Sequence, residues 1–264
     1  MTRIYFELNN RLVESEVNVM EKNSCVEAKE RIIEAAKQLF SQKGYDATRV
    51  NDIASIANVN KALIYYYFKS KQDILDYMVN SLLKNAVSLA LDFIQKNILQ
   101  MIQDGDLKIK PDCLHFVSDE AKESFLQNSQ IFYERLIDYV FDNKEIVRIL
   151  MLESLKNGKH QNSLFRFLKF ISGDEIEPII RTFSDAENRF VCSDEMILFN
   201  FFFSVVPIIS FAAYFDDYKA VSSRRDEQLR RAFLRVHQIV TKSLVSDSDI
   251  LLQNASTSLH SARS

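Results

Sequence analysis

The chain has 264 residues, more than one domain usually contains, and 47% of them are apolar while 26% are charged. Four glycines and three prolines are too few for an all-β protein built on turns, so the composition favours long helices in two modules, one small and one large. A net charge of −3 excludes a broadly basic surface, and any nucleic-acid binding must therefore depend on a local patch.

The two ends of the chain lack a sustained helical period. Residues 1–25 are expected to be an extension, with Met20 as an alternative start of the native chain, and the Ser-rich residues 246–264 are expected to be a disordered tail. No charged segment followed by an apolar stretch opens the chain, so no signal peptide is predicted. The three cysteines have neither disulfide nor metal spacing, which is typical of a reducing cytoplasm: Cys25, Cys113 and Cys192.

Between these ends the first predicted element is a helix over residues 26–43, because apolar side chains recur on one stripe. Gly44 follows its last basic residue, as a helix-ending glycine does. Thr48 then offers a hydroxyl N-cap for a short second helix, and a break at residues 58–60 leads into a third helix over 61–68. Three short helices in succession predict a small N-terminal domain over residues 26–72.

The rest of the chain is also predicted to be helical, over residues 73–245. Ser70 and Asp73 form a capping box for a long helix that extends to about residue 103, where Gly105 and Pro111 interrupt the pattern. Further amphipathic stretches follow, and no strand alternation is found: 118–141, 143–157, 162–171, 174–189, 193–217 and 224–245. The fold class predicted is all-α, a three-helix N-terminal domain followed by a larger helical C-terminal domain.

The segment TRVNDIASIANVNKALIYYYF, residues 48–68, meets the steric requirements of a helix-turn-helix. Ala54 is small where the two helices approach, and Asn58 tolerates a positive φ in the turn. Val59 supplies a buried apolar side chain, and Asn60 supplies a cap for the second helix. Two short amphipathic helices joined by a turn also occur by chance in helical proteins, so the geometry alone leaves DNA binding open.

The chemistry of the third helix favours DNA binding. Lysine ammonium groups and tyrosine hydroxyls are both suited to phosphate contacts, and they alternate in a window without an acid: Lys61, Tyr65, Tyr66, Tyr67, Lys69 and Lys71. Three consecutive tyrosines on one helix cannot all face DNA. Tyr65 is therefore expected to pack partly into the core.

The segment ERIIEAAKQLFSQKGYDATRVNDIASIANVNKALIYYYFKSKQDIL resembles the N-terminal domain of the TetR (tetracycline repressor-like) family. The shared pattern is an A-x-x-L-F first helix, a G-Y-x-A-T turn, a D-I-A second helix and a Y-x-x-F-x-x-K close, and it extends from about Ala28 to Leu83. The resemblance implies an all-helical dimer with a divergent, ligand-sensing C-terminal domain.

The same resemblance implies a set of DNA contacts: Thr48, Arg49, Asn60, Lys61, Ala62, Tyr65, Tyr66, Tyr67 and Lys71. Thr48 would cap the second helix and touch a phosphate, and Lys71 would belong to the phosphate-contacting end of the third helix. The family usually has Gly at position 58, Ser or Thr at 60, and often Gly then Thr at 62 and 63. These departures leave the fold intact but prevent transfer of an operator sequence.

Residues 196–215 form an uncharged stretch of transmembrane length. Its flanks are acidic, Pro207 interrupts it, and a helix buried between subunits is an alternative that these features favour. The resemblance implies a homodimer through the helices at about 193–217 and 224–245, so no membrane span is expected.

A small apolar effector is expected to bind in the C-terminal domain. Candidate lining residues come from the phenylalanine-rich stretches, where core packing is the alternative: Phe125, Phe132, Phe165, Phe167 and Phe203. His115, His160 and His237 lack ligand spacing, and no nucleophile-elbow or phosphate-loop motif occurs, so no metal, cofactor or enzymatic activity is predicted.

Together these observations predict a cytoplasmic, ligand-responsive transcriptional regulator, most often a repressor in such proteins. It would bind a pseudo-palindromic operator as a dimer through residues 49–68. Two other classes stay open at this point: a helical adaptor with an incidental helix-turn-helix, and a membrane-anchored regulator that uses residues 196–215.

Overall fold

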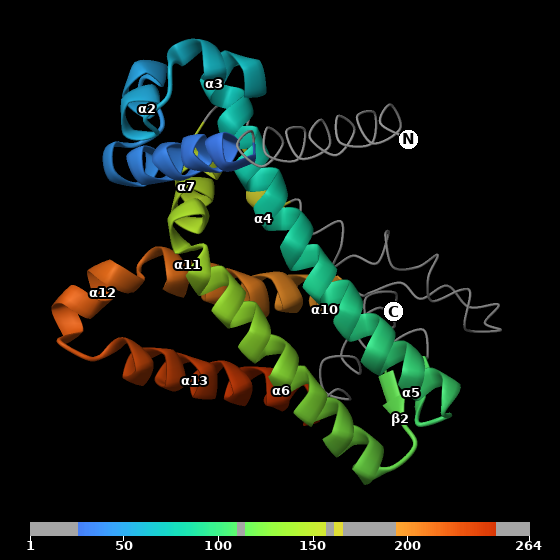
Figure 1. The fold of residues 1–264 in the computed structure, drawn as a ribbon. Helices are drawn as coiled ribbons and strands as arrows, with labels where there is room; N and C mark the ends of the chain where they lie inside the picture. The colour runs from blue at the N-terminus through green and yellow to red at the C-terminus, as the bar shows by residue number, and fades with distance from the viewer. Residues whose placement is uncertain (1–25, 110–113, 157–160, 166–193, 247–264) are drawn as a thin grey trace, which may run out of the picture. The chain divides into compact units, whose positions relative to one another are not determined.

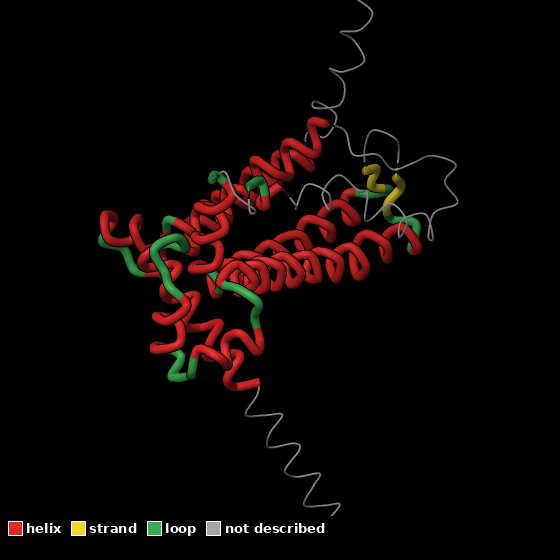
Figure 2. Tube along the Cα trace, turned by 90° about the horizontal axis from the view of Figure 1, so that it is seen from above, coloured by secondary structure: helices red, strands yellow, loops and turns green. Residues whose placement is uncertain are grey.

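The computed structural model describes residues 26–109, 114–156, 161–165 and 194–246. The chain divides into two compact units, Met1–Asn80 and Ser81–Ser264. The division falls inside a long helix, whereas the sequence placed the boundary at residues 72–73. Figures 1 and 2 show that the described chain is helical apart from one small β-ribbon, which confirms the all-α class.

Unit 1 contains the predicted three short helices and the beginning of the long one. A helix over residues 26–43 is followed by α2 (Val50–Ile56), α3 (Lys61–Tyr67) and the start of α4 (Lys71–Phe93). All four helices contribute fully buried side chains to the core of unit 1: Ile32, Leu39, Phe40, Ile53, Ile64, Ile74 and Leu75. Burial of this apolar stripe is what holds such short helices together.

The turn between the helix over 26–43 and α2 corrects one prediction. Gly44 adopts φ 84°, as a helix-ending glycine should. Thr48, however, does not cap α2: its hydroxyl donates to the Gly44 carbonyl at 2.8 Å, and only 1% of the residue is exposed. Arg49 occupies the cap position, where its N–H donates to the Asp52 carboxylate at 3.2 Å. The predicted capping role of Thr48 is therefore wrong, because its hydroxyl satisfies the end of the preceding helix instead.

The long helix begins and ends as predicted. The Asp73 N–H donates to the Ser70 hydroxyl at 3.1 Å, and the helical path continues from α4 through η1 (Ile94–Leu99) and α5 (Gln100–Gln103). Gly105 with φ 81° ends it. Since η1 is a π-helical segment, the apolar stripe shifts there, a change that a fixed 3.6-residue period does not anticipate.

A short antiparallel β-ribbon follows and was not predicted. It pairs β1 (Leu107–Ile109) with β2 (Leu114–Phe116), with Leu107 opposite Phe116. Strands of three residues are too short to display an alternation of apolar and polar residues. Leu107 is buried against Met101, Ala121 and Phe125, so the ribbon extends the core at this end of unit 2.

Unit 2 is otherwise built from helices. They are α6 (Asp119–Asp142), α7 (Lys144–Ser154), the 3-10 turn η2 (Ser163–Phe165), α10 (Asp194–Phe199), the π-helical η3 (Asn200–Val205), α11 (Val206–Ala213), α12 (Phe215–Ser222) and α13 (Asp226–Ser246). The predicted stretch 174–189, and 162–171 apart from η2, lie outside the described residues. So do the segments 1–25 and 247–264.

The core of unit 2 is rich in aromatic rings. Phe211 stacks on Phe233 with ring centroids 4.2 Å apart, and Phe141 meets Phe215 edge to face at 4.8 Å. These rings come from α11, α13, α6 and α12, so they join the two predicted C-terminal helices to α6.

The predicted helix over 193–217 is not continuous. Ile197–Ala213 and Phe215–Ser222 meet at a bend of 67°, and only together do they reach the length and apolar composition of a membrane span. No single helix in the described residues is long and apolar enough to cross a membrane.

Candidate nucleic-acid interface

The turn between α2 and α3 has the predicted helix-turn-helix geometry. Asn58 adopts φ 51°, and the Val59 N–H donates to the Ala54 carbonyl at 3.0 Å. The Asn60 side-chain oxygen then accepts from the Leu63 N–H at 2.7 Å, which caps α3. An asparagine therefore performs each of the two tasks that sequence reasoning assigned to it, the left-handed turn and the N-cap.

Helix α3 separates a buried face from an exposed one. Ile64 is 1% exposed and faces the core of unit 1. The exposed side chains recur at helical spacing and thus share one face: Lys61, Ala62, Tyr65 and Tyr66, with Lys69 just beyond the helix. This α3 face, as these five residues are called below, combines two cations with two tyrosines. Arg49 and Asn60 are exposed as well.

The three tyrosines divide differently from the prediction. Tyr66 is 74% and Tyr65 49% exposed, whereas Tyr67 is partly buried with its ring edge-on to Tyr66 at 5.0 Å. Tyr67 lies three residues after Ile64 and therefore continues the inward stripe. The expectation that Tyr65 packs into the core is wrong, and Tyr67 takes that role.

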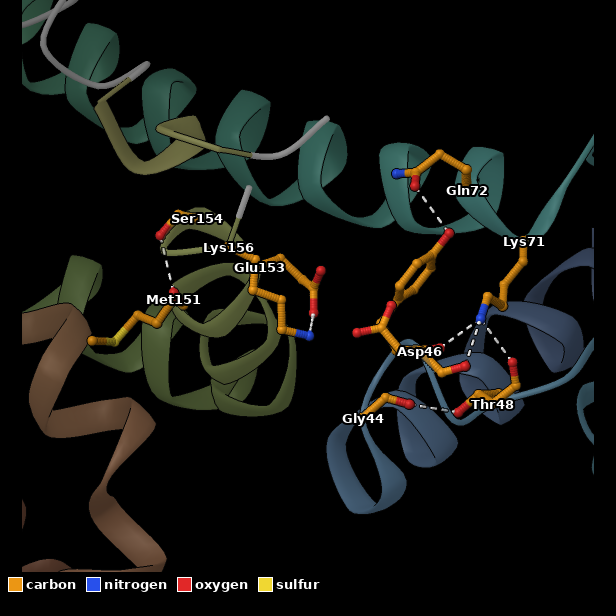
Figure 3. A network of polar contacts seen from close by, with 10 residues as sticks. Gly44, Asp46, Thr48, Lys71, Gln72, Met151, Glu153, Ser154 and Lys156 are labelled. Carbon is orange, nitrogen blue, oxygen red and sulfur yellow. Dashed lines mark hydrogen bonds and ion pairs between the residues drawn. The ribbon is translucent and has the colours of Figure 1, made fainter. Parts of the chain in front are cut away.

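Lys71 already has backbone partners in this structure, and its phosphate contact stays a prediction. Its ammonium group donates to the carbonyl oxygens of Tyr45 at 2.6 Å, Thr48 at 2.8 Å and Asp46 at 3.4 Å (Figure 3). An ammonium has three N–H donors, so these carbonyls occupy all of them. Lys71 thus ties the turn over 45–48 to the start of α4.

A second contact strengthens the same connection. The Tyr45 hydroxyl donates to the Gln72 side-chain oxygen at 2.9 Å (Figure 3), and the Lys71 ammonium lies 4.2 Å from the centre of the Tyr45 ring. Thr48 is buried in this turn, so its hydroxyl cannot reach a phosphate in this arrangement. This network could not be predicted from the sequence, because it depends on backbone carbonyls that any residue possesses.

The charge near the α3 face is positive on balance. Asp52 and Asp73 are the nearby acids, and each carboxylate accepts a backbone N–H, from Arg49 at 3.2 Å and from Lys69 at 3.0 Å. The side chains of Arg49 and Lys69 are exposed, and the Lys61 ammonium lies 5.8 Å from the centre of the Tyr65 ring. Such a patch suits a polyanion in a chain whose net charge is negative.

The predicted effector-lining phenylalanines do not form one group. Phe125 and Phe132 lie beside Phe93, with centroid distances of 6.1 and 4.8 Å. Phe165 instead stacks on Phe201 at 5.3 Å. Phe203 is 58% exposed, and Phe167 lies outside the described residues.

A buried polar cluster in unit 2 was missed. The Nε2 atom of His237 is 3.0 Å from the Ser204 carbonyl, and the His237 ring is 4.6 Å from that of Tyr133. Burial lowers the pKa of His237 and raises the pKa of Tyr133. A lone histidine within an apolar stretch carries no spacing signal in the sequence. Within the ranges that the structure covers, no group of three or more His, Cys, Asp or Glu is placed to hold a metal.

The chain is similar in sequence to known bacterial regulators. Residues 32–78 match the family described as bacterial regulatory proteins, tetR family. The probable HTH-type transcriptional regulator YttP of Bacillus subtilis is 30% identical over 142 residues, which are 51% of this chain and 68% of that protein. The biofilm operon icaADBC HTH-type negative transcriptional regulator IcaR of Staphylococcus epidermidis is 26% identical over 148 residues, 47% of this chain and 78% of that protein.

Among solved structures, a TetR-family transcriptional regulator of Haemophilus influenzae is 19% identical. The match covers 81% of this chain and 96% of that one, with a TM-score of 0.39.

Proposed function

Because the chain belongs to the TetR family of bacterial regulatory proteins, we propose that it is a ligand-responsive repressor that binds a pseudo-palindromic DNA site as a homodimer. Its relatives are DNA-binding transcription regulators, which confirms the prediction of a regulator that is not an enzyme. Repression is supported by IcaR, a relative whose name describes a negative regulator.

The observation that carries the proposal is the α3 face. Lys61 and Lys69 are exposed on the same side as Tyr65 and Tyr66, and Ile64 anchors the opposite side of α3 in the core. The ammonium and hydroxyl groups would contact phosphates, while the small Ala62 would let the helix approach base edges in the major groove. The structure also supports Arg49 and Asn60 as contacts, because both are exposed.

An exposed apolar face on the last helices supports the homodimer. On α13, Val236 is 60% and Ile239 69% exposed, and these residues lie three apart on one stripe. Phe202 and Phe203 in η3 are also exposed. Exposed apolar side chains grouped on one helix face often mark a protein interface, and two copies related by a two-fold axis would cover them with the same surface.

The effector is proposed to bind in unit 2 and to change the spacing of the two α3 helices. It would do so through α4, which begins in unit 1 and continues into unit 2. The dimer would exist in two conformations, one whose α3 spacing fits DNA and one whose spacing does not. A ligand that binds the second conformation more tightly would lower the affinity for DNA, and its difference in affinity for the two conformations sets the size of the effect.

Selection of bound fragments from the source genome, followed by footprinting, tests the proposal. We expect two protected half-sites about one helical turn apart, two chains per duplex, and an affinity that falls steeply with salt. Failure to select any duplex at low salt, or protection of a single half-site by one chain, would contradict it.

A further inference from the structure

Three buried side-chain polar atoms in unit 2 have no hydrogen-bond partner among the described residues. Arg230 Nε belongs to a guanidinium group that forms an ion pair with Asp138 through another nitrogen. The other two are the Ser204 hydroxyl oxygen and the His237 Nδ1 atom, in residues that are only 2% and 3% exposed. A buried polar atom without a partner destabilises the fold. Two such atoms on neighbouring side chains are therefore not explained by packing alone.

The hydrogen bond of His237 Nε2 determines whether the other ring nitrogen, Nδ1, is a donor or an acceptor. Nε2 faces the Ser204 carbonyl at 3.0 Å, and a carbonyl can only accept, so Nε2 carries the proton. Burial lowers the pKa of His237, so the ring is neutral at pH 7 and Nδ1 is left with a lone pair. Nδ1 is consequently an acceptor that needs an O–H or N–H donor.

The surroundings of these atoms are mainly aromatic. The Tyr133 ring is 4.6 Å and the Phe233 ring 6.0 Å from that of His237. Among the charged side chains of α6 and α13, Arg230 and Asp138 form an ion pair at 3.1 Å. An additional uncompensated charge would be unfavourable here, whereas aromatic or aliphatic surface would be favourable.

The backbone is also irregular at this place. Ser204 belongs to η3, a π-helical segment, and its carbonyl is the one that receives His237. Such π-helical turns recur at functional sites, where the extra residue turns side chains and carbonyls toward a ligand.

We propose that Ser204, His237 and the neighbouring Tyr133 form the polar end of the effector site, and that the effector is an uncharged, largely aromatic molecule with one O–H or N–H donor. The donor would bond His237 Nδ1, and the Ser204 hydroxyl would bond the same polar group. This proposal rests on the proposed function, because it specifies the effector of that regulator.

The test uses the full chain labelled with ¹⁵N-histidine. The probes are phenol, 1-naphthol and indole, and each has a match without the donor: anisole, 1-methoxynaphthalene and N-methylindole. We expect at least one donor probe to shift the His237 Nδ1 resonance, identified by its absence from His237→Gln, while its match does not. If every donor probe behaves like its match, the buried atoms bind at most internal water and the proposal is overturned.

Two variants and a control complete the experiment. His237→Gln can keep an amide donor for the Ser204 carbonyl but removes the ring nitrogen Nδ1, and Ser204→Ala removes the hydroxyl. Each should weaken binding of the responding probe by about tenfold, whereas the exposed His115→Gln should not change it. Unchanged affinity in both folded variants would also overturn the proposal.

DNA binding is measured in parallel, since its absence in the unsubstituted protein would contradict the proposed function but leave the probe result intact.

Discussion

At the scale of single residues, Lys71 and Lys61 show why residue type does not determine role. Both are lysines beside the tyrosine-rich α3, and both were predicted from the sequence to contact a DNA phosphate. Lys61 is exposed, while Lys71 faces three carbonyl oxygens of the turn over 45–48. The difference arises from a turn far from Lys71 in sequence, so sequence reasoning could not distinguish the two.

Substitution of Lys71 by Met should therefore act on stability. The change removes the ammonium donor from the carbonyls of Tyr45 and Thr48, in a partly buried place, although the Tyr45 carbonyl keeps the Thr48 N–H at 3.3 Å. It should lower the free energy of unfolding by about 1–3 kcal/mol. Chemical denaturation measures this. Lys69→Met, at an exposed neighbouring site, is the control and should change stability by less than about 0.5 kcal/mol. Equal effects of the two substitutions would mean that the Lys71 contacts contribute nothing specific.

His237 should make the stability depend on pH. Its pKa in the folded chain is below the ordinary 6.5, so the unfolded chain binds more protons as the pH falls through that value. The free energy of unfolding should be constant above this range and decrease as the pH falls below it. Thermal unfolding between about pH 5.5 and 7.5 measures the slope, which His237→Gln should reduce. An identical slope in the variant would show that His237 is not the group responsible.

At the scale of elements, unit 1 was predictable because several local signals agree there. The apolar stripe of residues 26–43, the positive φ expected at Gly44 and Asn58, and the cap by Asn60 are all confirmed. In unit 2 the π-helical turns, the short β-ribbon and the bend at Tyr214 were not predicted. Each depends on packing between distant segments rather than on a repeating local pattern.

The turn between α2 and α3 provides an element-scale prediction. Asn58 has φ 51°, a conformation that glycine adopts without strain and that β-branched residues strongly avoid. Asn58→Gly should leave stability within about 0.5 kcal/mol, whereas Asn58→Val should reduce it by about 1–2 kcal/mol and weaken DNA binding. Denaturation midpoints of the two variants test this. A valine variant as stable as the glycine variant would exclude strain at this turn.

At the scale of the whole molecule, the sequence identified the residues of the proposed DNA-binding face more directly than those of the proposed effector site. A DNA-contacting helix has a regular exposed stripe, and Lys61, Tyr65 and Tyr66 follow it. Residues that line a ligand site and residues of a core are both apolar and share the same period. For that reason the phenylalanines predicted to line the effector site lie beside different partners in the structure. The buried polar atoms of Ser204 and His237 were found only from the coordinates.

The proposed dimer can be tested on α13. Val236→Asp combined with Ile239→Asp places two charges on the exposed apolar stripe and should convert dimers to folded monomers at micromolar concentration. Sedimentation measures the mass, and circular dichroism checks the fold. Val221→Asp, at an 86% exposed position on α12, is the matched control and should leave the mass unchanged. Dimers that persist in the double variant would place the interface elsewhere.

The central claim, that the α3 face binds DNA, is tested most directly by Lys61→Ala with Tyr66→Ala. Both side chains are exposed, so their removal should leave the fold and the dimer intact. Fluorescence anisotropy on a selected genomic duplex, measured across a salt series, should show binding weakened by about tenfold or more, and a salt dependence reduced by about one counterion per subunit. The exposed pair Lys108→Ala with Tyr218→Ala should bind like the unsubstituted protein. Unchanged affinity and salt dependence in the Lys61 and Tyr66 variant would contradict the claim.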